Sequence, residues 1–587
     1  MKDAAPREWI LRSPDPDAVR EVATRNGLAS AAAKVLVNRG IVEPRDVERF
    51  LYGTLSDLPD PSLLKDADKA ARRLAAAGSR GEPLLIYADY DADGATGAAC
   101  LYLFLKQVFP DLPVRIHQND RRKDGYGLQT HVLAPAAREG FRLVVTVDCG
   151  ISDVAAVREA ARQGVEVIVT DHHLPGEAVP EAFAVVNPMQ PDCAFPGKET
   201  AGVGVAFLLV CALRRAVRES GGFANRPEPP LRPYLDLVAL GTVSDMAALR
   251  GGNRLLVREG LREIRKSPRP GIEALFDVSG VPHSAATETD LGFRVGPRLN
   301  AAGRVGDSAR SSRILVAESR EEAGRLAREL NEDNALRQRE EERIVVAVEA
   351  ALAAAGEIPP AIVLSNPAWN AGVLGIVASK VLERYCRPVV LLQEEDGAAK
   401  GSCRSVEGFH IVSALSSLSH LLTRFGGHAQ AAGLALSLEH LAAFREGLAG
   451  IADRHAREIP FVRRRTIDAR LRIDEIIPDL LADLGRLRPF GMGNEEPLFL
   501  LPNVRVAEIS RIGAGGRHIR FAVEEDGRRL SGVAFRRKEI PADAAGRSDL
   551  LFTVQENVYR GARSLQILLK DARAAGEPVL CEGTPPG

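Results

Sequence analysis

The chain has 587 residues, which at roughly 150 residues per domain is enough for about four domains with several hydrophobic cores. Hydrophobic residues make up 45% and charged residues 26%, a composition that disfavours a disordered chain, a fibrous repeat and a membrane protein. Lys and Arg number 77 against 78 Asp and Glu, a net charge of −1 that by itself argues against a nucleic-acid partner.

The seven cysteines are scattered and never spaced as Cys-x-x-Cys, which fits neither a zinc ribbon nor a disulfide framework. The N-terminus lacks an apolar stretch of the signal-peptide kind, and the longest apolar run, residues 203–213, is too short to span a bilayer. We therefore expect a cytoplasmic protein in a reducing compartment, without membrane contact.

The first part of the chain changes character near residue 80. Residues 1–80 predict a helical segment of short helices separated by prolines. In residues 81–255, short apolar runs alternate with helical stretches, in the order 84–87, 95–109, 143–147, 152–163 and 165–169. This alternation indicates an α/β domain, with a parallel sheet covered on both faces.

The second part is predicted to contain a linker and two further domains. Residues 256–355 form the linker, and their end, residues 311–355, is polar and typical of a long bridging helix. Strand and helix patterns alternate again in residues 356–458, which predicts a second α/β domain. Residues 459–575 contain short strands and predict a small β-barrel of the oligonucleotide-binding kind, with a sandwich as the alternative; residues 576–587 form a tail.

Acidic side chains follow the predicted strands of the first α/β domain. The positions are Asp89, Asp91 and Asp93 after the first run, Asp148 after the second, and Asp171-His172-His173 after the third. The carboxyl ends of parallel strands share one edge of the sheet, and carboxylates gathered there need cations to offset their repulsion. Carboxylates with one or two imidazoles suit Mn²⁺ or Mg²⁺.

A plainer interpretation is that each Asp caps a helix or makes a turn. That interpretation suits any one of them, but a cap needs one Asp, and residues 89–93 offer three. Residues 235–243 predict a buried helix, and Asp245 at its end is a further candidate ligand.

Four motifs in this order resemble the DHH phosphoesterase superfamily: Asp-x-Asp-x-Asp-Gly at 89–94, Val-Asp-Cys-Gly-Ile at 147–151, Asp-His-His at 171–173 and Gly-Thr-Val-Ser-Asp at 241–245. Residues 120–128, 296–304, 401–405, 426–433 and 490–499 are similar to motifs of the RecJ family of single-strand-specific 5′→3′ exonucleases. Three residues depart from the family pattern: Asp120 stands for a usual Asn, Asn370 for a common His and Cys403 for a common Gly.

The resemblance implies a DHH domain joined by a long helix to a DHHA1-like domain, plus an OB-like barrel. It implies a metal-dependent exonuclease that hydrolyses single-stranded DNA to 5′-mononucleotides in DNA repair and recombination. Two divalent cations are expected, Mn²⁺ first and Mg²⁺ as the alternative. The implied ligands are Asp89, Asp91, Asp93, Asp148, His172 and Asp245.

Two residues have an implied catalytic role, the ligand Asp148 and the neighbouring His173. Asp148 would bridge the two ions, while Asp89 would assist from outside the direct ligands. His173 would contact the phosphate or protonate the leaving oxygen; the alternative is an imidazole that only orients His172.

The other motifs imply contacts to the DNA strand. The candidate substrate-binding residues are Arg121, Arg298, Asn300, Arg304, Ser402, Arg404, Gly426, Gly427 and His428. Arginine and hydroxyl donors suit phosphate oxygens, and glycines let a strand approach closely. The plainer alternative is a Gly-Gly turn and solvated arginines.

The predicted barrel carries a local excess of positive charge. Residues 501–540 contain nine Lys and Arg against five Asp and Glu, a net charge of +4. Phe521 and Phe535 lie among these bases, where they could stack on DNA bases, although barrel core is the expected place for at least one of them.

Two other functions remain possible on this pattern. The superfamily also includes phosphodiesterases of nanoRNA and cyclic dinucleotides and inorganic pyrophosphatases, but such small substrates need no basic barrel. A non-catalytic DNA-binding scaffold should have lost some ligands, and all are present. The expected partner is single-stranded DNA; a single-strand-binding protein and a helicase are candidate protein partners, and a monomer is the default.

Overall fold

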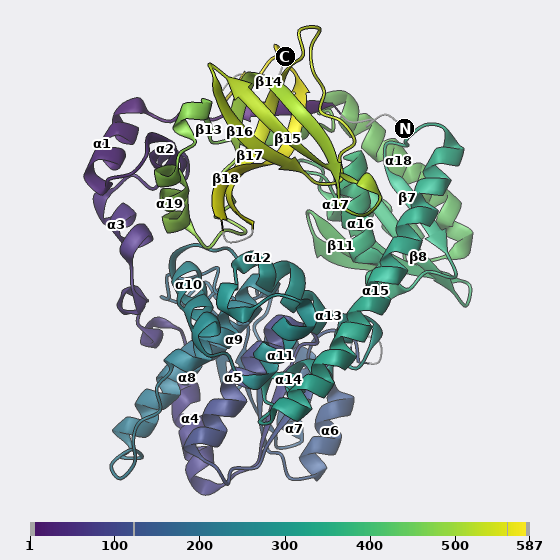
Figure 1. Cartoon of the computed structure of the whole chain (residues 1–587). Helices are drawn as coiled ribbons and strands as arrows, with labels where there is room; N and C mark the ends of the chain where they lie inside the picture. Colours follow the sequence, from purple (N-terminus) through teal and green to yellow (C-terminus); the bar gives the residue numbers. More distant parts are fainter. Residues whose placement is uncertain (1–5, 121–123, 560–561, 583–587) are drawn as a thin grey trace.

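The computed structural model describes residues 6–120, 124–559 and 562–582 (Figure 1). The first α/β domain contains a five-stranded parallel sheet in the order β3-β2-β4-β5-β6. The strands are β2 (Leu84–Ala88), β3 (Val114–Gln118), β4 (Leu143–Val147), β5 (Glu166–Thr170) and β6 (Ala184–Val186). The predicted parallel sheet is confirmed.

Both faces of this sheet are buried. Leu84 and Ile86 of β2 pack against α4 (Ala67–Arg80), α5 (Ala92–Val108) and α8 (Gly202–Glu219). Leu85 and Tyr87 point to the other face, where α6 (Thr130–Arg138) and α7 (Val154–Arg162) lie. Burial on both faces explains why the strands are continuous apolar runs rather than alternating ones.

A group of helices follows the sheet and leads to the second domain. It comprises α9 (Leu235–Ser244), α10 (Gly251–Lys266), α11 (Pro270–Ser279), α12 (Glu288–Asp290), α13 (Gly296–Val305) and α14 (Ala309–Leu315). The long α15 (Arg320–Ala355) then runs from the first domain to the second (Figure 1). The predicted start of this helix at residue 311 is wrong, because Ser319 accepts a hydrogen bond from the Glu322 N–H and begins a new helix there.

The second α/β domain has a mixed sheet in the order β10-β11-β9-β8-β7. Its elements are β7 (Ile362–Asn366), α16 (Ala371–Tyr385), β8 (Val389–Glu395), β9 (Ala398–Arg404), α17 (Ile411–Ser417), β10 (Arg424–His428), β11 (Ala431–Ser437) and α18 (Leu441–Glu458). The helices α15 and α16 cover one face and α18 covers the other.

The C-terminal part is a closed barrel, as predicted, and not a sandwich. Its strands are β13 (Ala469–Arg470), β14 (Phe499–Ile512), β15 (His518–Glu525), β16 (Arg528–Ala534), β17 (Arg547–Tyr559) and β18 (Ala562–Ala574). Pairing of β14 with both β15 and β17 closes the sheet. Asp526 and Gly527 form the turn between β15 and β16, both with positive φ, which suits a two-residue hairpin.

The N-terminal segment packs on this barrel. Helices α1 (Pro16–Asn26), α2 (Ser30–Asn38) and α3 (Pro44–Tyr52) share a hydrophobic core with the barrel strands and α19 (Pro478–Leu487). Ahead of them β1 (Arg7–Leu11) lies parallel between β12 (Arg463–Ile467) and β19 (Leu580–Cys581). The sequence did not predict β1, because its partners lie more than 450 residues away. No helix in the described part of the chain is both long and apolar enough to cross a bilayer.

Candidate metal centre and nucleic-acid cavity

The predicted ligands meet at the carboxyl edge of the parallel sheet. Three groups bring their ligating atoms within 4.8 Å of one another: Asp148, His172 and His173; Asp93, His172 and Asp245; and Asp89, Asp91 and Asp148. Asp148 belongs to two of these groups, which suits the predicted position between two ions. The tertiary structure thus brings together every residue predicted as a metal ligand.

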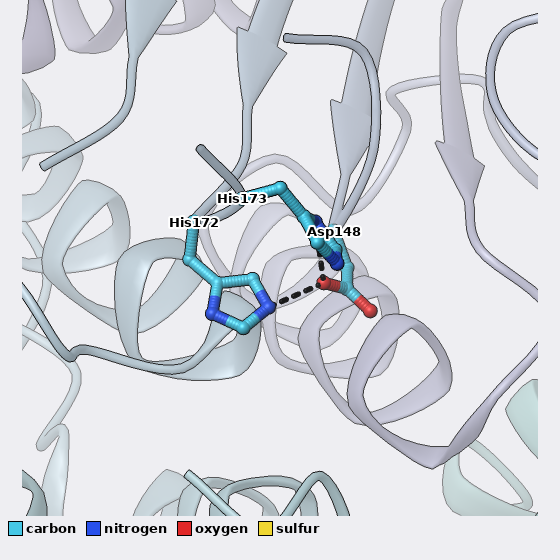
Figure 2. Close-up of side chains that lie close together, drawn as sticks. All are labelled: Asp148, His172 and His173. Atoms are coloured by element: carbon cyan, nitrogen blue, oxygen red, sulfur yellow. Dashed lines mark ion pairs between the residues drawn. The ribbon is translucent and has the colours of Figure 1, made fainter. Parts of the chain in front are cut away.

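His172 lies at the centre of the cluster. Its Nε2 is 3.1 Å from Asp148 Oδ1, 3.8 Å from Asp93 Oδ2 and 3.9 Å from Asp245 Oδ2. His173 approaches from the other side, with Nδ1 3.9 Å from the same Asp148 oxygen (Figure 2). These separations leave room for an ion to take the place of direct contact.

Helix starts hold two of the acids in place. Asp91 caps α5, and its Oδ1 accepts from the backbone N–H groups of Asp93 and Gly94. The Asp93 carboxylate accepts from the N–H groups of Gly202 (2.7 Å) and Val203 (2.8 Å) at the start of α8. The positive end of that helix stabilises the negative charge. The capping interpretation of Asp91 is therefore confirmed, beside its place in the cluster.

Three ligating atoms at the centre are buried without a hydrogen-bond partner among the residues that the structure describes. They are Asp89 Oδ1, Asp148 Oδ1 and His172 Nε2. Such orphaned polar atoms are rare in folded proteins and call for a physical explanation. Carboxylate oxygens with an imidazole are suitable ligands for Mn²⁺ and Mg²⁺. The residues present therefore fit divalent cations.

Burial and mutual repulsion shift the pKa values of the cluster. Burial, followed by the charge of Asp91, raises the pKa of Asp93 to about 7. Burial, followed by Asp93, raises the pKa of Asp245 to about 9 and places that of Asp148 well above its usual range. Burial and the neighbouring His173 lower the pKa of His172 to about 4. Without cations the cluster therefore retains protons, which an incoming metal must displace.

Asp171 is a buried residue that the predicted site did not include. Its Oδ1 accepts from the backbone N–H groups of His172 and His173 and lies 2.7 Å from His173 Nδ1, while Oδ2 accepts from the Ile151 N–H. Burial alone lowers the pKa of His173, but the hydrogen bond and charge of Asp171 outweigh it and raise that pKa. The position of Asp171 directly before the two histidines was the sequence signal for its role in orienting His173.

A cavity of about 1330 Å³ lies between the first and second domains. Tyr90, Tyr126 and Gly303 line it from the first domain, and Trp369 and Asn370 from the second. Tyr126 connects the cavity to the cluster, because its hydroxyl lies 3.2 Å from His173 Nδ1. The sequence did not single out Tyr126, although it stands within the motif at 120–128.

Five predicted substrate-binding residues line this cavity: Arg304, Ser402, Arg404, Gly426 and Gly427. The two glycines lie in strand β10, not in a turn. A Cβ on Gly427, whose φ is +143°, would lie 2.4 Å from the Ala431 carbonyl oxygen, whereas a Cβ on Gly426 would enter open space. Gly427 is required by the sheet, and Gly426 leaves a clear surface facing the cavity.

Family models match three parts of the chain: "DHH family, N-terminal domain" at residues 83–242, "DHHA1 domain" at 359–452 and "RecJ OB domain" at 467–571. The single-stranded-DNA-specific exonuclease RecJ of Bacillus subtilis is 34% identical over 573 residues, which cover 97% of this chain and 71% of that protein. Its namesake in Dickeya dadantii is 37% identical, over 93% of this chain and 96% of that one. The chain belongs to the RecJ family.

A solved RecJ structure agrees with the whole fold. The crystal structure of RecJ in complex with Mn²⁺ from Thermus thermophilus covers 100% of this chain and 82% of its own, at 33% identity and a TM-score of 0.83. A second structure of that protein contains Mg²⁺, with a TM-score of 0.76 and 31% identity. Both ions predicted from the ligand chemistry are thus seen in a RecJ protein of the same fold.

The remaining predicted substrate residues lie elsewhere. Arg298 donates to Asn331 Oδ1 and to the carbonyls of Arg294 and Val278, which joins α13 to its neighbours. Asn300 Oδ1 accepts from the Ala92 N–H at the start of α5, 2.8 Å away. His428 is exposed on β10, and Arg121 lies outside the described residues. Contacts of these four residues with substrate stay predictions.

Two of the three departures from the RecJ pattern have a local explanation. Asn370 caps α16 by accepting from the Gly372 N–H. Cys403 is buried in the second domain's core. Asp120 receives no explanation from the structure.

In the barrel, Phe521 is 2% exposed and belongs to the core, whereas Phe535 is 55% exposed on the surface. The expectation that at least one of the two phenylalanines is core is confirmed.

Proposed function

We propose that the chain is a metal-dependent exonuclease that hydrolyses single-stranded DNA from its 5′ end to 5′-mononucleotides, with a role in DNA repair and recombination. The observation that carries this proposal is the set of buried ligating atoms of Asp89, Asp148 and His172 that lack a hydrogen-bond partner among the described residues, beside a cavity lined by arginines and glycines. Membership of the RecJ family supports the choice of substrate.

Two divalent cations would be held by this cluster, Mn²⁺ first and Mg²⁺ as the alternative. Asp91, Asp93, His172 and Asp245 would bind them, with Asp148 between the two and Asp89 in support. When bound, such a pair activates water for in-line attack and stabilises charge on the scissile phosphate. The chain itself supplies a fixed frame, since backbone N–H groups already orient Asp91 and Asp93.

His173 would act on the substrate directly. The contact between its Nδ1 and Asp171 orients the ring and stabilises its protonated form. Nε2 would then donate to a phosphate oxygen or protonate the leaving oxygen. Since Asp171 already provides an orienting partner for His173, the structure favours this role over that of a mere support for His172.

The second domain and α13, which carries Arg304, would bind the DNA strand. Arg304, Ser402 and Arg404 provide donors that suit phosphate oxygens, and Gly426 leaves space for a backbone or base. A phosphate group held there, next to the cluster, would account for recognition of a strand end. Arg121 and His428 are proposed as additional phosphate contacts. The basic residues of the barrel and the exposed Phe535 would hold the following nucleotides.

The proposal is tested by offering four substrates side by side with Mn²⁺: 5′-labelled single-stranded DNA, duplex DNA, a dinucleotide and pyrophosphate. We expect mononucleotides to be released first from the 5′ end of the single strand, and Asp148→Ala to abolish release. Preferential cleavage of the dinucleotide or of pyrophosphate would assign the chain to a different reaction of the superfamily. Tight DNA binding without hydrolysis would identify a scaffold.

Protein partners are proposed from the family resemblance alone. A single-strand-binding protein and a helicase are the candidates, and the chain is proposed to act as a monomer. Light scattering after size-exclusion chromatography, with and without each partner, tests both statements. A dimer of the isolated chain would contradict the second.

A further inference from the structure

We propose that the turn formed by residues 490–495, at the entrance to the barrel, is a positioning element of the metal centre. It holds the segment that follows Asp245 and so fixes where that carboxylate lies. The inference rests on the proposed function, because it takes Asp245 as a metal ligand. The turn lies far from Asp245 in sequence, and its contacts with residues 248–250 connect the barrel to the cluster.

Asp245 lies at the end of a rigid helix and the start of a short irregular segment. Its backbone N–H still donates to Gly241 in α9 (2.9 Å), but the next residue, Met246, has φ +61° and leaves the helix. A non-glycine residue with such a φ is strained and needs support from its surroundings. The direction of the chain after Asp245 therefore depends on what holds residues 247–250.

The turn provides that support through two hydrogen bonds. The Leu249 N–H donates to the Met492 carbonyl at 2.7 Å, and Arg250 Nε donates to the Gly493 carbonyl at 3.0 Å. Leu249 is buried against the turn, where a Cβ on Gly491 would lie 2.8 Å from its Cδ1. Four residues after the proposed ligand, the chain is thus clamped from the barrel side.

The turn is itself rigid. Gly491 and Asn494 exchange backbone hydrogen bonds of 2.9 and 3.1 Å. The buried Asn494 side chain donates to the carbonyls of Leu487 and Pro489 and accepts from Arg39 of the N-terminal helices. A polar side chain with all its groups paired in this way specifies one conformation.

A second contact joins the turn to the other side of the site. The Phe490 N–H donates to Glu288 Oε1 at 2.9 Å, and Arg488 pairs with the same buried carboxylate. Glu288 begins α12, which leads into α13 and Asn300, the residue bonded to the start of α5. The turn therefore contacts two chain segments that approach the cluster from outside the parallel sheet, the one that follows Asp245 and the one that leads to α13.

Gly493 is the position at which this role can be tested. Its φ is +71°, and an added Cβ would lie 2.9 Å from Arg250 Nε and 3.3 Å from the Ala248 Cβ. The substitution Gly493→Ala therefore displaces the Arg250 side chain from its hydrogen bond to the turn and presses on Ala248. Gly546 of the same domain is a matched control, because its φ is +74° and a Cβ there meets nothing within 4 Å. Both substitutions carry the same backbone strain, and only one displaces residues 248–250.

The experiment measures the Mn²⁺ affinity of the full chain by calorimetric titration, and kcat and KM on single-stranded DNA over a range of Mn²⁺ concentrations. For Gly493→Ala we expect about 10-fold weaker binding of one Mn²⁺, the usual effect of disturbing a residue that orients a ligand. Excess Mn²⁺ should restore kcat, and KM should not change. Gly546→Ala should match the parent protein.

Two further variants keep the result decisive. Arg250→Ala removes only an exposed side chain from the contact, so it tests the clamp if Gly493→Ala fails to fold; we expect about 3-fold weaker Mn²⁺ binding. Asp245→Asn should weaken binding more than either. If the turn only stabilises the fold, Gly493→Ala and Arg250→Ala should lower the unfolding temperature and leave Mn²⁺ affinity unchanged. That result would overturn the proposal.

The outcomes separate this inference from the function on which it rests. Weaker binding in Asp245→Asn with unchanged binding in both Gly493→Ala and Arg250→Ala removes the turn's role alone. Unchanged binding in Asp245→Asn removes Asp245 from the ligands, and the positioning role with it. Weaker binding in all three variants, restored by excess Mn²⁺, supports both.

Discussion

The two α/β domains contribute opposite kinds of surface to one site. In the first domain Asp89, Asp93 and Asp148 are buried, and backbone N–H groups already hold the Asp93 carboxylate without a cation. In the second, the cavity wall is a sheet of small residues, with Ser402 and Gly426 each paired to Gly433 and Arg404 beside them. The comparison indicates that the reacting groups are fixed in advance, while the substrate side is open and is completed by the strand itself.

The strongest test of the buried carboxylates in the first domain is the substitution of Asp148. Since its carboxylate belongs to two of the three ligand groups, we expect Asp148→Ala to reduce kcat with Mn²⁺ by on the order of 10³-fold or more. The fold should remain, because the substitution removes a buried carboxyl group that is costly to ionise beside its neighbours. Steady-state hydrolysis and circular dichroism measure the two effects. The exposed Asp192, paired with Lys65, provides an Ala control that should change neither.

Loss of a cavity-lining side chain of the second domain should weaken DNA binding rather than slow hydrolysis. We expect Arg404→Ala to raise KM for single-stranded DNA by about 10- to 100-fold, which is the usual value of a charge-assisted hydrogen bond to phosphate. Its kcat at saturating DNA should fall much less. Arg454→Ala, on the exposed surface of the same domain, is the control. A fall in kcat with an unchanged KM would contradict the proposed distinction between a catalytic first domain and a DNA-binding second domain.

Substitution of Asp171 tests whether the fixed geometry of the first domain also includes His173. In Asp171→Asn the pKa of His173 should fall, because the charge of the carboxylate is lost and the remaining amide oxygen is a weaker acceptor. If protonated His173 acts as the acid, activity at high pH is lost at a lower pH than in the parent, and kcat falls by about 10- to 100-fold. A pH–rate profile measures both. An unmoved alkaline limb would contradict the acid role.

The barrel should show a smaller contrast of the same kind, between an exposed residue that binds DNA and a buried residue that stabilises the fold. Phe535→Ala should weaken binding of long single strands by about 10-fold, within the 1 to 3 kcal/mol of one base stack, and leave stability unchanged. Phe521→Ala should cost about 3 to 5 kcal/mol of unfolding free energy, since the ring is buried in the core. Filter binding and denaturant unfolding separate the two. Point variants are preferable to deletion from residue 461, because the barrel shares its core with α1–α3.

The smallest expected effect is on stability in the absence of metal. The pKa of Asp93 rises from 3.8 to about 7 on folding and that of Asp245 to about 9, so the folded state binds these protons more tightly. Their contribution is therefore complete at acid pH and is lost as pH rises through these values. With a chelator, the unfolding temperature should fall by a few °C between pH 6 and 9, and Mn²⁺ should reverse the loss. A rise with pH in chelator would contradict the buried cluster.

The near-zero net charge is the sum of these unlike regions. Acids gather on one sheet edge, where cations would neutralise them, while residues 501–540 of the barrel region carry a net charge of +4. A cation-filled edge also attracts a polyanion. The overall charge balance therefore excludes a uniformly basic DNA-coating protein and is compatible with a local nuclease groove.

The sequence by itself determined the elements and the acids. Buried parallel strands are continuous apolar runs, so β2, β4 and β5 were visible, and each places its acid at the same edge. The geometry of a parallel sheet then required Asp89, Asp148 and His172 to meet, without any knowledge of distances. Motifs covering the second domain and the barrel extended this to the fold.

Only the tertiary structure decided the contacts between distant segments. The pairing of β1 with β12, the packing of α1–α3 on the barrel and the clamp of residues 490–495 on 248–250 join segments hundreds of residues apart. The structure likewise showed Arg298 bonded to protein groups and Tyr126 beside His173. Local propensity and periodicity carry no information on such pairs, because their energy comes from packing and hydrogen bonds formed after the chain has folded.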